Sequence, residues 1–236
     1  SNIALIVIGD GPERGNLDTL IKALKLEDNV FLMGYRDNVC DFLYQSDLFA
    51  HPSVAEGFGI AVIEAMMAEK PVIAAINGAV AGASVATMMA CDLIIAADTA
   101  KFGFNFINIG FTPDSGASYF LTQKVGYHKA LEILWYGKVL DSAEALSLGL
   151  VNKVVAKDQV LTEAEKWAER LLKMPLYSVW MDKKLIRASL KNDFYQQAEL
   201  ESLNQVLAWT SDDFKEGVMS FVEKRKPNFT GKVLCD

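Results

Sequence analysis

The sequence predicts an α/β fold in which a parallel βαβ sheet is followed by an all-helical C-terminal tail. Short apolar runs closed by glycine and proline turns, as at residues 3–8, are typical of buried parallel strands. Segments with apolar residues at helical spacing alternate with these runs, which indicates right-handed βαβ units. Beyond residue 161 only the helical spacing remains, so no further strand is expected there.

The expected elements follow one another at short, even spacing up to residue 76. Strands are expected at residues 3–8, 30–33, 47–51 and 71–76. Helices are expected at residues 12–26, 37–44 and 58–69. The first of these helices has a single apolar face, made by Leu17, Leu20, Ile21 and Leu24.

The alternation continues after Asn77 with smaller side chains. Strands are expected at residues 93–97, 101–104 and 150–155. Helices are expected at residues 82–91, 116–125, 129–136 and 142–148. Because no linker rich in Pro, Gly or Ser separates the two halves, we expect them to share one sheet or to pack closely.

Composition and charge exclude several classes of function. The chain is 51% hydrophobic and 22% charged, as in a globular protein, and its net charge of −7 argues against a nucleic-acid surface. The three cysteines and two histidines lack the spacing of a metal site, a CxxC pair or a catalytic triad, so free thiols and no metal are expected. The sequence shows neither a signal peptide nor a membrane span, which predicts a cytoplasmic protein.

A first chemical motif, Glu56-Gly57-Phe58-Gly59 followed by Glu64, lies where a strand is expected to give way to a helix. Glycines at a helix start allow a phosphate to approach closely, and the free N–H groups and the helix dipole favour its charge. The carboxylate of Glu64 could accept hydrogen bonds from a sugar hydroxyl. A tight turn followed by a solvated glutamate is the simpler interpretation of the same residues.

Residues from about 3 to 74 resemble the C-terminal, nucleotide-sugar-binding domain of retaining glycosyltransferases with two Rossmann-like domains. The resemblance lies in VIGDGPERGNL, LEDNVFLMGY, SDLFAHPSVAEGFGIAVIEAM and KPVIA. It implies that Glu56 faces the donor sugar and that Glu64 binds the ribose. It also implies that the Gly57–Gly59 turn binds the phosphates. The family's basic pair and acceptor domain have no counterpart here, so we expect no glycosyl transfer and at most weak nucleotide binding.

A second motif, NGAVAGASVATMMACD at residues 77–92, puts Gly82, Ala83 and Ser84 at the start of a helix rich in small residues. Backbone N–H groups at such a helix start can stabilise an oxyanion. Close packing of a helix in an α/β protein accounts for the same small residues without any ligand.

Residues from about 70 to 229 resemble the C-terminal part of the crotonase (enoyl-CoA hydratase/isomerase) superfamily. The resemblance lies in KPVIAAINGAVAGASVATMMACDLIIAADTAKFGF, IGFTPDSGASYFLTQKVGYHKALEILWYGK, SAEALSLGLVNKVV and SDDFKEGVMSFVEKRKPNF. It implies a parallel βαβ sheet in which a Rossmann-like N-terminal part of the chain merges into a crotonase-like half. It also implies that the backbone N–H of Ala83 is an oxyanion donor for a thioester carbonyl, with Gly82 and Ser84 beside a bound acyl-CoA. No further cofactor is required.

The same resemblance bears on acid–base chemistry. Hydratases of the superfamily carry two glutamates that activate water, at positions that correspond to Ala86 and Phe106, so hydration is not expected. Asp114, in TPDSG, falls where isomerases of the superfamily place one carboxylate. Such a group would take a proton from the alpha carbon of an acyl-CoA and return it at the gamma carbon. An Asp before Ser-Gly is also a common helix N-cap, and the two roles are compatible.

Half of this second site is missing as well. The superfamily's first oxyanion donor and most of its adenine contacts come from strands before KPVIA, and glycosyltransferase-like sequence replaces those strands. Losing one oxyanion donor costs ~3–4 kcal/mol in comparable sites. Lys224, Arg225 and Lys226 could meet a phosphate, but a solvated basic stretch is the favoured interpretation.

The join falls inside KPVIA, which both family patterns contain as a buried parallel strand, so a crossover there preserves the strand register. We therefore expect a recombined or engineered chimera. Its expected parts are a glycosyltransferase-like segment at 1–75, a crotonase-like α/β core at 70–160 and a crotonase-like helical region at 161–236. The tail resembles the part through which crotonases form trimers, so a homotrimer is compatible with the sequence.

Three functional hypotheses follow from the sequence. The first is a chimeric scaffold that keeps part of an isomerase-like site without efficient catalysis. The second is a working enoyl-CoA delta-isomerase with Asp114 as its base. The third is a module that binds a nucleotide, a nucleotide sugar or CoA without turnover, through the Gly57–Gly59 turn or the helix start at Gly82. None of them involves nucleic acid or a membrane.

Overall fold

A computed structural model describes residues 4–46, 49, 60–68 and 70–230 of the chain. By its internal contacts the chain divides into two compact units, Ser1–Ser46 and Asp47–Asp236. Both units are built from strands and helices, and the C-terminal region is helical, so the predicted α/β class is confirmed.

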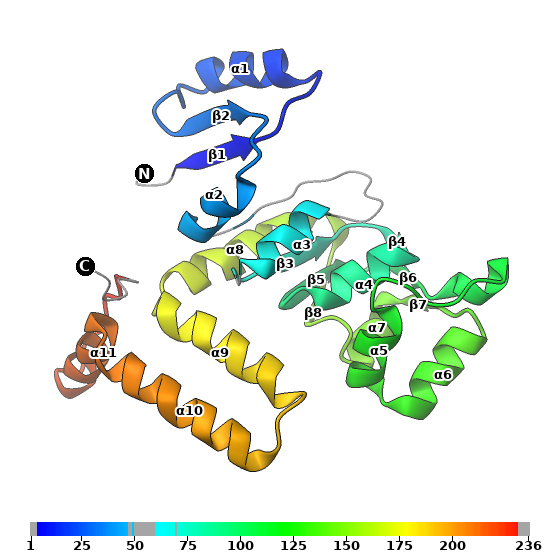
Figure 1. Cartoon of the computed structure of the whole chain (residues 1–236). Helices are drawn as coiled ribbons and strands as arrows, with labels where there is room; N and C mark the ends of the chain where they lie inside the picture. Colours follow the sequence, from blue (N-terminus) through cyan, green and yellow to red (C-terminus); the bar gives the residue numbers. More distant parts are fainter. Residues whose placement is uncertain (1–3, 47–48, 50–59, 69, 231–236) are drawn as a thin grey trace. The chain divides into compact units, whose positions relative to one another are not determined.

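The N-terminal unit is a βαβα segment (Figure 1). Strands β1 (Leu5–Ile8) and β2 (Val30–Gly34) pair in parallel, and helix α1 (Arg14–Ala23) connects them. A short helix α2 (Val39–Gln45) follows β2. Among the described side chains of this unit only that of Leu43 is buried, so the unit has almost no apolar core of its own.

The C-terminal unit contains two three-stranded sheets. In the first, β3 (Ile73–Ile76), β5 (Leu93–Ala97) and β8 (Lys153–Val155) are parallel and lie in the order β3-β5-β8. In the second, β4 (Ala79–Ala81) pairs in parallel with β6 (Lys101–Gly103), and β7 (Val139–Asp141) pairs antiparallel with β6.

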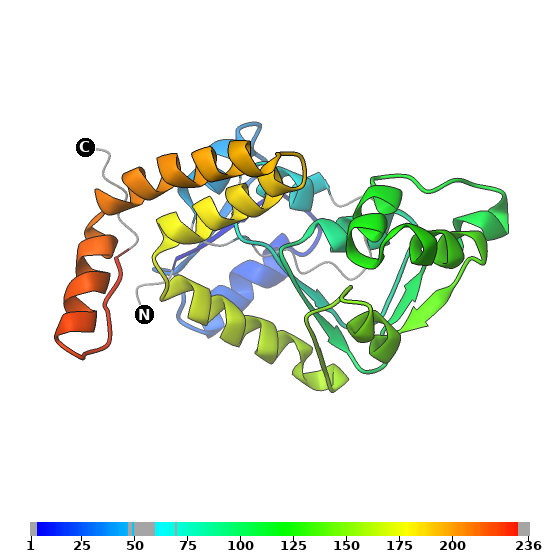
Figure 2. The same cartoon turned by 90° about the horizontal axis from the view of Figure 1, so that it is seen from below.

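Helices cover these sheets and make up the whole tail (Figure 1). Before the tail they are α3 (Ile60–Met67), α4 (Ala83–Ala90), the 3-10 turn η1 (Asn105–Ile109), α5 (Ala117–Val125), α6 (Tyr127–Trp135) and α7 (Ser142–Ser147). The tail comprises the 3-10 turn η2 (Lys157–Gln159), α8 (Val160–Leu172), α9 (Leu176–Ser189), α10 (Phe194–Trp209) and α11 (Asp212–Val222). Figure 2 shows α9 and α10 side by side. None of the helices in the described ranges is both long and apolar enough to cross a membrane.

Among the described strands β1 and β2 pair only with each other. The three-residue strands β4 and β7 were not expected, and β7 pairs antiparallel with β6. Of the strand expected at residues 47–51 only Phe49 is described, so that expectation stays a prediction.

A single apolar cluster holds the C-terminal unit together. It joins α4, β5, β6 and α5, and its largest fully buried side chains include Phe102, Phe104 and Leu121. The hydroxyl of Ser142, at the start of α7, is buried here and donates to the carbonyl of Ala97 at 2.6 Å. The cluster therefore fixes α4 and α5, the two helices whose starts carry the second motif and the TPDSG segment.

An ion pair attaches the helical tail to the β3-β5-β8 sheet. The Lys183 ammonium on α9 donates to Asp92 Oδ2 at 2.6 Å, and Asp92 precedes β5. The same oxygen accepts the N–H of Val72 at 2.8 Å, and Lys183 also donates to the carbonyl of Lys70 at 2.6 Å. The side chains of Lys183 and Asp92 are only 8% and 23% exposed. One carboxylate thus joins α9, the start of β3 and the start of β5.

Burial alters the titration of this cluster. Desolvation lowers the pKa of Lys183, although its hydrogen bond to Asp92 opposes the shift. Burial and the neighbouring Asp92 charge raise the pKa of the Cys91 thiol to about 12, so this cysteine stays protonated and unreactive at neutral pH. The ammonium of Lys70 lies 4.3 Å from the centre of the Trp180 ring on α9, which adds a cation–π contact to the same junction.

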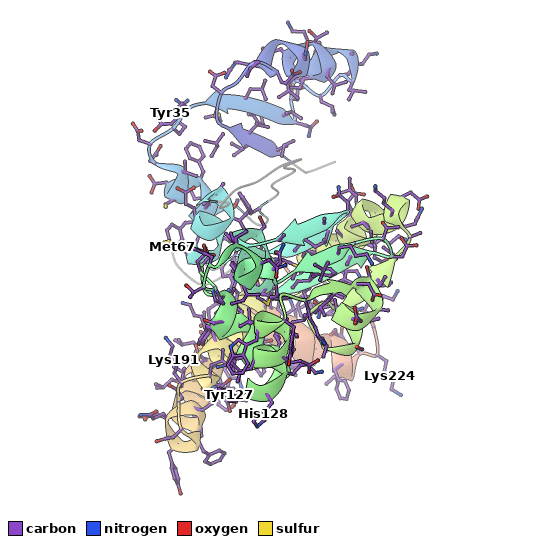
Figure 3. The ribbon with its side chains drawn as sticks, turned by 90° about the vertical axis from the view of Figure 1, so that its right-hand side faces the viewer. Tyr35, Met67, Tyr127, His128, Lys191 and Lys224 are labelled. Atoms are coloured by element: carbon purple, nitrogen blue, oxygen red, sulfur yellow. The ribbon has the colours of Figure 1, made fainter. Side chains whose placement is uncertain are left out.

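Replacing Lys183 should loosen this junction. We expect Lys183→Ala to lower the free energy of unfolding by about 2–3 kcal/mol, because Asp92 would keep its charge in a partly buried site with weaker partners. The effect is measured by urea denaturation, in which the dependence of the unfolding free energy on urea concentration should be the same in the variant as in the wild type. The control is Lys191→Ala, since Lys191 is exposed just beyond α9 (Figure 3). Equal midpoints for the two variants would show that the ion pair does not support the fold.

Candidate functional site

The second motif forms a strand–turn–helix in which Gly82 is the turn. Strand β4 ends at Ala81 and α4 begins at Ala83, with Gly82 as the N-cap residue. Gly82 has φ +60° and ψ −134°, a conformation that only glycine adopts without strain. The N–H of Ala83, the first residue of α4, has no acceptor within the helix. The turn therefore places a main-chain donor at the start of α4.

The two positions that the sequence analysis predicts to correspond to the hydratase glutamates are apolar and buried. Ala86 lies one turn into α4 with its side chain 0% exposed. Phe106 lies in η1 and is 6% exposed, and both belong to the same apolar cluster. Neither residue offers an atom that could hold or transfer a proton. A water molecule would find no polar partner on these two side chains.

Asp114 lies in the loop that connects η1 to α5. Its side chain is exposed, whereas its main-chain carbonyl accepts the N–H of Ala117 at 2.8 Å. The next two residues, Ser115 and Gly116, have φ values of +50° and +87°, so two consecutive left-handed residues follow Asp114. The Ser-Gly pair after Asp114 forms this left-handed turn, whereas the sequence analysis predicts Asp114 before Ser-Gly to be a helix N-cap.

The N-cap interpretation of Asp114 is wrong. The N-cap of α5 is Gly116, and no side chain caps this helix. The left-handed turn shifts the helix start beyond the reach of the Asp114 carboxylate. That carboxylate is therefore not used in holding α5. Helix α5 packs against α4. The loop with Asp114 precedes α5 and the turn at Gly82 precedes α4, so the two segments lead into helices that are in contact.

The first motif lies mostly outside the described residues. Glu56, Gly57, Phe58 and Gly59 belong to that part, so their predicted contacts with a nucleotide sugar stay predictions. Glu64 is described, on α3, and is half-buried.

The basic stretch at residues 224–226 is engaged within the tail. The guanidinium of Arg225 donates to both carboxylate oxygens of Glu216, at 2.5 and 2.7 Å, and this pairing lowers the pKa of Glu216 to about 2. Glu216 also accepts the N–H of Asn228 at 2.7 Å, so this carboxylate on α11 holds both Arg225 and Asn228. The exposed side chain of Lys224 points outward (Figure 3).

Within the described ranges no group of His, Cys, Asp and Glu side chains could hold a metal ion. His128 is exposed at the start of α6, beside Tyr127, with ring centroids 5.4 Å apart (Figure 3). Cys40 and Cys91 are free thiols.

Two protein families match different parts of the chain. The model of the enoyl-CoA hydratase/isomerase family matches residues 53–232. The model of glycosyl transferases group 1 matches residues 1–85. The predicted double resemblance is therefore confirmed.

Curated relatives include both hydratases and isomerases. A crotonyl-CoA hydratase from Syntrophomonas wolfei is 39% identical over 171 residues, covering 72% of this chain and 65% of that protein. A 1,2-epoxyphenylacetyl-CoA isomerase from Escherichia coli is 35% identical, with 69% and 62% covered. A trans-2-decenoyl-[acyl-carrier-protein] isomerase from Streptococcus mutans is also 35% identical, with the same coverage. The chain thus spans less than two thirds of the length of these relatives.

Solved structures agree in fold. An enoyl-CoA hydratase from Polaromonas sp. JS666 matches with a TM-score of 0.69 and 28% identity, covering 95% of each chain. Enoyl-CoA hydratase subunit I from Geobacillus kaustophilus matches with a TM-score of 0.70 and 26% identity, covering 96% of this chain and 94% of that one. The family match over residues 53–232 and the shared fold lead to one conclusion: the chain belongs to the enoyl-CoA hydratase/isomerase family.

Proposed function

We propose that the crotonase-like part of this chain binds an acyl-CoA thioester and acts on it as a slow enoyl-CoA isomerase. Asp114 takes a proton from the alpha carbon and returns it at the gamma carbon, so one C–H bond breaks, another forms and the double bond moves between them. The N–H of Ala83, at the turn next to Gly82, binds the thioester oxygen while negative charge develops on it. Ser84 and Gly82 lie beside the same bound thioester.

The burial of Ala86 and Phe106 carries this proposal. Hydration needs groups that position and activate a water molecule, and these two side chains are apolar and packed in the core. A proton shuttle needs only one carboxylate, and that of Asp114 is exposed and does not cap α5. The curated relatives include hydratases that are 37–39% identical to the chain and two proteins named as isomerases that are 35% identical, so an isomerase lies within the range of the family.

The proposed turnover is inefficient because the site is incomplete. Residues before β3 resemble a glycosyltransferase, so the superfamily's first oxyanion donor has no counterpart. Removing one such donor lowers kcat by about 10²–10³ in comparable enzymes. The chimeric origin, whether natural or engineered, belongs to the same proposal, as do the parts at 1–75, 70–160 and 161–236. We expect measurable but slow isomerisation and a homotrimer as the assembly.

The base is tested with Asp114→Asn. Conversion of a medium-chain 3-enoyl-CoA to the 2-enoyl-CoA, followed by absorbance of the conjugated thioester, should fall by about 10²-fold or more, since the amide cannot accept the proton. Binding of the same ligand, measured by calorimetry, should change little. Asp158→Asn, an exposed aspartate in η2, is the matched control and should retain full activity. Equal loss in both variants, or no loss in Asp114→Asn, would refute the role of Asp114.

The oxyanion donor is tested with Ala83→Pro. Proline is well tolerated at the first position of a helix, so the fold should survive while the N–H is removed. We expect the affinity for an enoyl-CoA to fall, and kcat to fall by about 10²-fold. Ala83→Gly keeps the N–H and should retain both. Unchanged binding and kcat in the proline variant, with the circular dichroism spectrum also unchanged, would exclude this donor.

A further inference from the structure

The turn at Gly82 lies beside Gly103, the last residue of strand β6. Ala81, the last residue of β4, is paired in register with Gly103 across the parallel ladder. The next residue, Gly82, donates its N–H to the carbonyl of Gly103 at 3.4 Å. Strand β4 therefore enters the turn, and the turn enters α4, in contact with the main chain of Gly103.

Close packing, and not backbone conformation, accounts for the glycine at position 103. Gly103 lies in a strand and is not among the residues with positive φ. A Cβ at this position would lie 3.1 Å from the Cβ of Ala81 and 3.7 Å from its Cα. The best separation of two carbon atoms in contact is about 3.5–4.0 Å. The close approach of β4 to β6 therefore excludes a side chain on Gly103.

Strand β6 is held too firmly to yield to such a side chain. Its neighbours in the sequence, Phe102 and Phe104, are 0% exposed and belong to the apolar cluster. On the other side of β6, Gly103 is paired with Val139 of β7. Ala81, in contrast, is exposed. A Cβ on Gly103 would therefore displace Ala81, and the turn after it, by a few tenths of an ångström.

This displacement would fall on the N–H of Ala83. Helix α4 is fixed from Val85 and Ala86 onward, because both residues are 0% exposed in the apolar cluster. The short segment between Ala81 and Val85 would take up the movement. The other atom near the added Cβ, Oδ1 of Asn105 at 3.2 Å, ends an exposed and flexible side chain that can move away.

We propose that Gly103 is a positioning residue of the acyl-CoA site, because its missing side chain lets β4 lie close to β6 and so sets the direction of the Ala83 N–H. This role rests on the proposed function of Ala83 as the thioester donor and extends that site to β6. Oxyanion stabilisation depends on donors that are aligned before charge develops. A misplacement of about 1 Å can lower a rate by about 10²-fold, so a few tenths of an ångström should lower it by about tenfold.

The test exchanges the two residues of the Ala81–Gly103 pair. Gly103→Ala should lower kcat for isomerisation of an enoyl-CoA by about tenfold, with a smaller change in KM, because the hydrogen bond to the oxyanion is strongest in the transition state. The double variant Ala81→Gly/Gly103→Ala lacks the opposing methyl group and should regain kcat to within about twofold of the wild type.

Two single variants serve as controls. Ala81→Gly removes a methyl group without adding one and should keep the wild-type kcat. Gly78→Ala adds a methyl group just before β4, where a Cβ would meet no atom of the described residues within 4 Å, and should keep it as well. Thermal unfolding of each variant shows whether it is folded at the assay temperature.

The amide spectrum reports the direction of the N–H without any substrate. Isotope labelling of glycine carbonyls and alanine amides selects the Gly-Ala pairs of the chain, whose alanines are Ala79, Ala83 and Ala117. The Ala83 signal should move in Gly103→Ala and return to its wild-type position in the double variant. The signal of Ala117, at the start of α5, should stay in place throughout.

Failure of this role can be told apart from failure of the proposed function. A wild type that neither binds nor isomerises an enoyl-CoA would refute the proposed function, and the Ala83 signal would still decide the role of Gly103. An unmoved Ala83 signal in Gly103→Ala would overturn the positioning role. A folded double variant whose kcat or Ala83 signal is not restored would overturn it too. If Gly103→Ala does not fold, the double variant decides alone: wild-type values support the role, and a failure to fold overturns it.

Discussion

The carboxylate of Asp92 is the interaction on which the C-terminal unit depends. It accepts the N–H of Val72 before β3 and the ammonium of Lys183 on α9, and it follows Cys91, the C-cap of α4. Because a partly buried charge is costly when unpaired, arrangements that move the start of β3 or α9 away from this carboxylate are disfavoured. The other end of α4 is fixed by the turn at Gly82. A helix held at both ends keeps its first N–H groups in one direction, which is the condition for an oxyanion site to be preorganised.

The candidate site is built from segments that are local in the sequence. The turn at Gly82, the start of α4 and the loop with Asp114 all lie after β3 and within the match to one family. Their geometry follows from neighbouring residues, such as the glycine conformation at Gly82 and the left-handed pair after Asp114. Contacts that the family obtains from strands before β3 are not local, and no feature of the later segments can replace them. On the proposed function, the chain therefore keeps one donor and one base while the rest of the site is missing.

Much of the fold could be predicted because its signals are long and periodic. Helix α1 and strand β5 were predicted to within a few residues, since each has an apolar pattern that extends over its length, and the tail after residue 161 was predicted to be helical without bounds for its helices. Strands β4 and β7 were not predicted, and their pairing with β6 depends on tertiary contacts that no local pattern indicates. The cap at α5 was misassigned to Asp114 because Asp-Ser-Gly also fits a left-handed turn that ends at Gly116. The Lys183–Asp92 pair joins residues 91 positions apart, which no local pattern indicates.

The junction between the two family patterns explains why the N-terminal unit has so little core. Strand β3 pairs with β5, as the later pattern requires, and among the described strands β1 and β2 pair only with each other. Buried parallel strands are apolar on both faces because helices normally cover both, and here the sequence of β1 keeps that composition with few neighbours. Leu5 and Ile6 are consequently half exposed, although their pattern is that of a buried strand. Recombination within a strand that both patterns share preserves the register of that strand. It does not supply the helices and strands that would cover β1 and β2 in the earlier pattern.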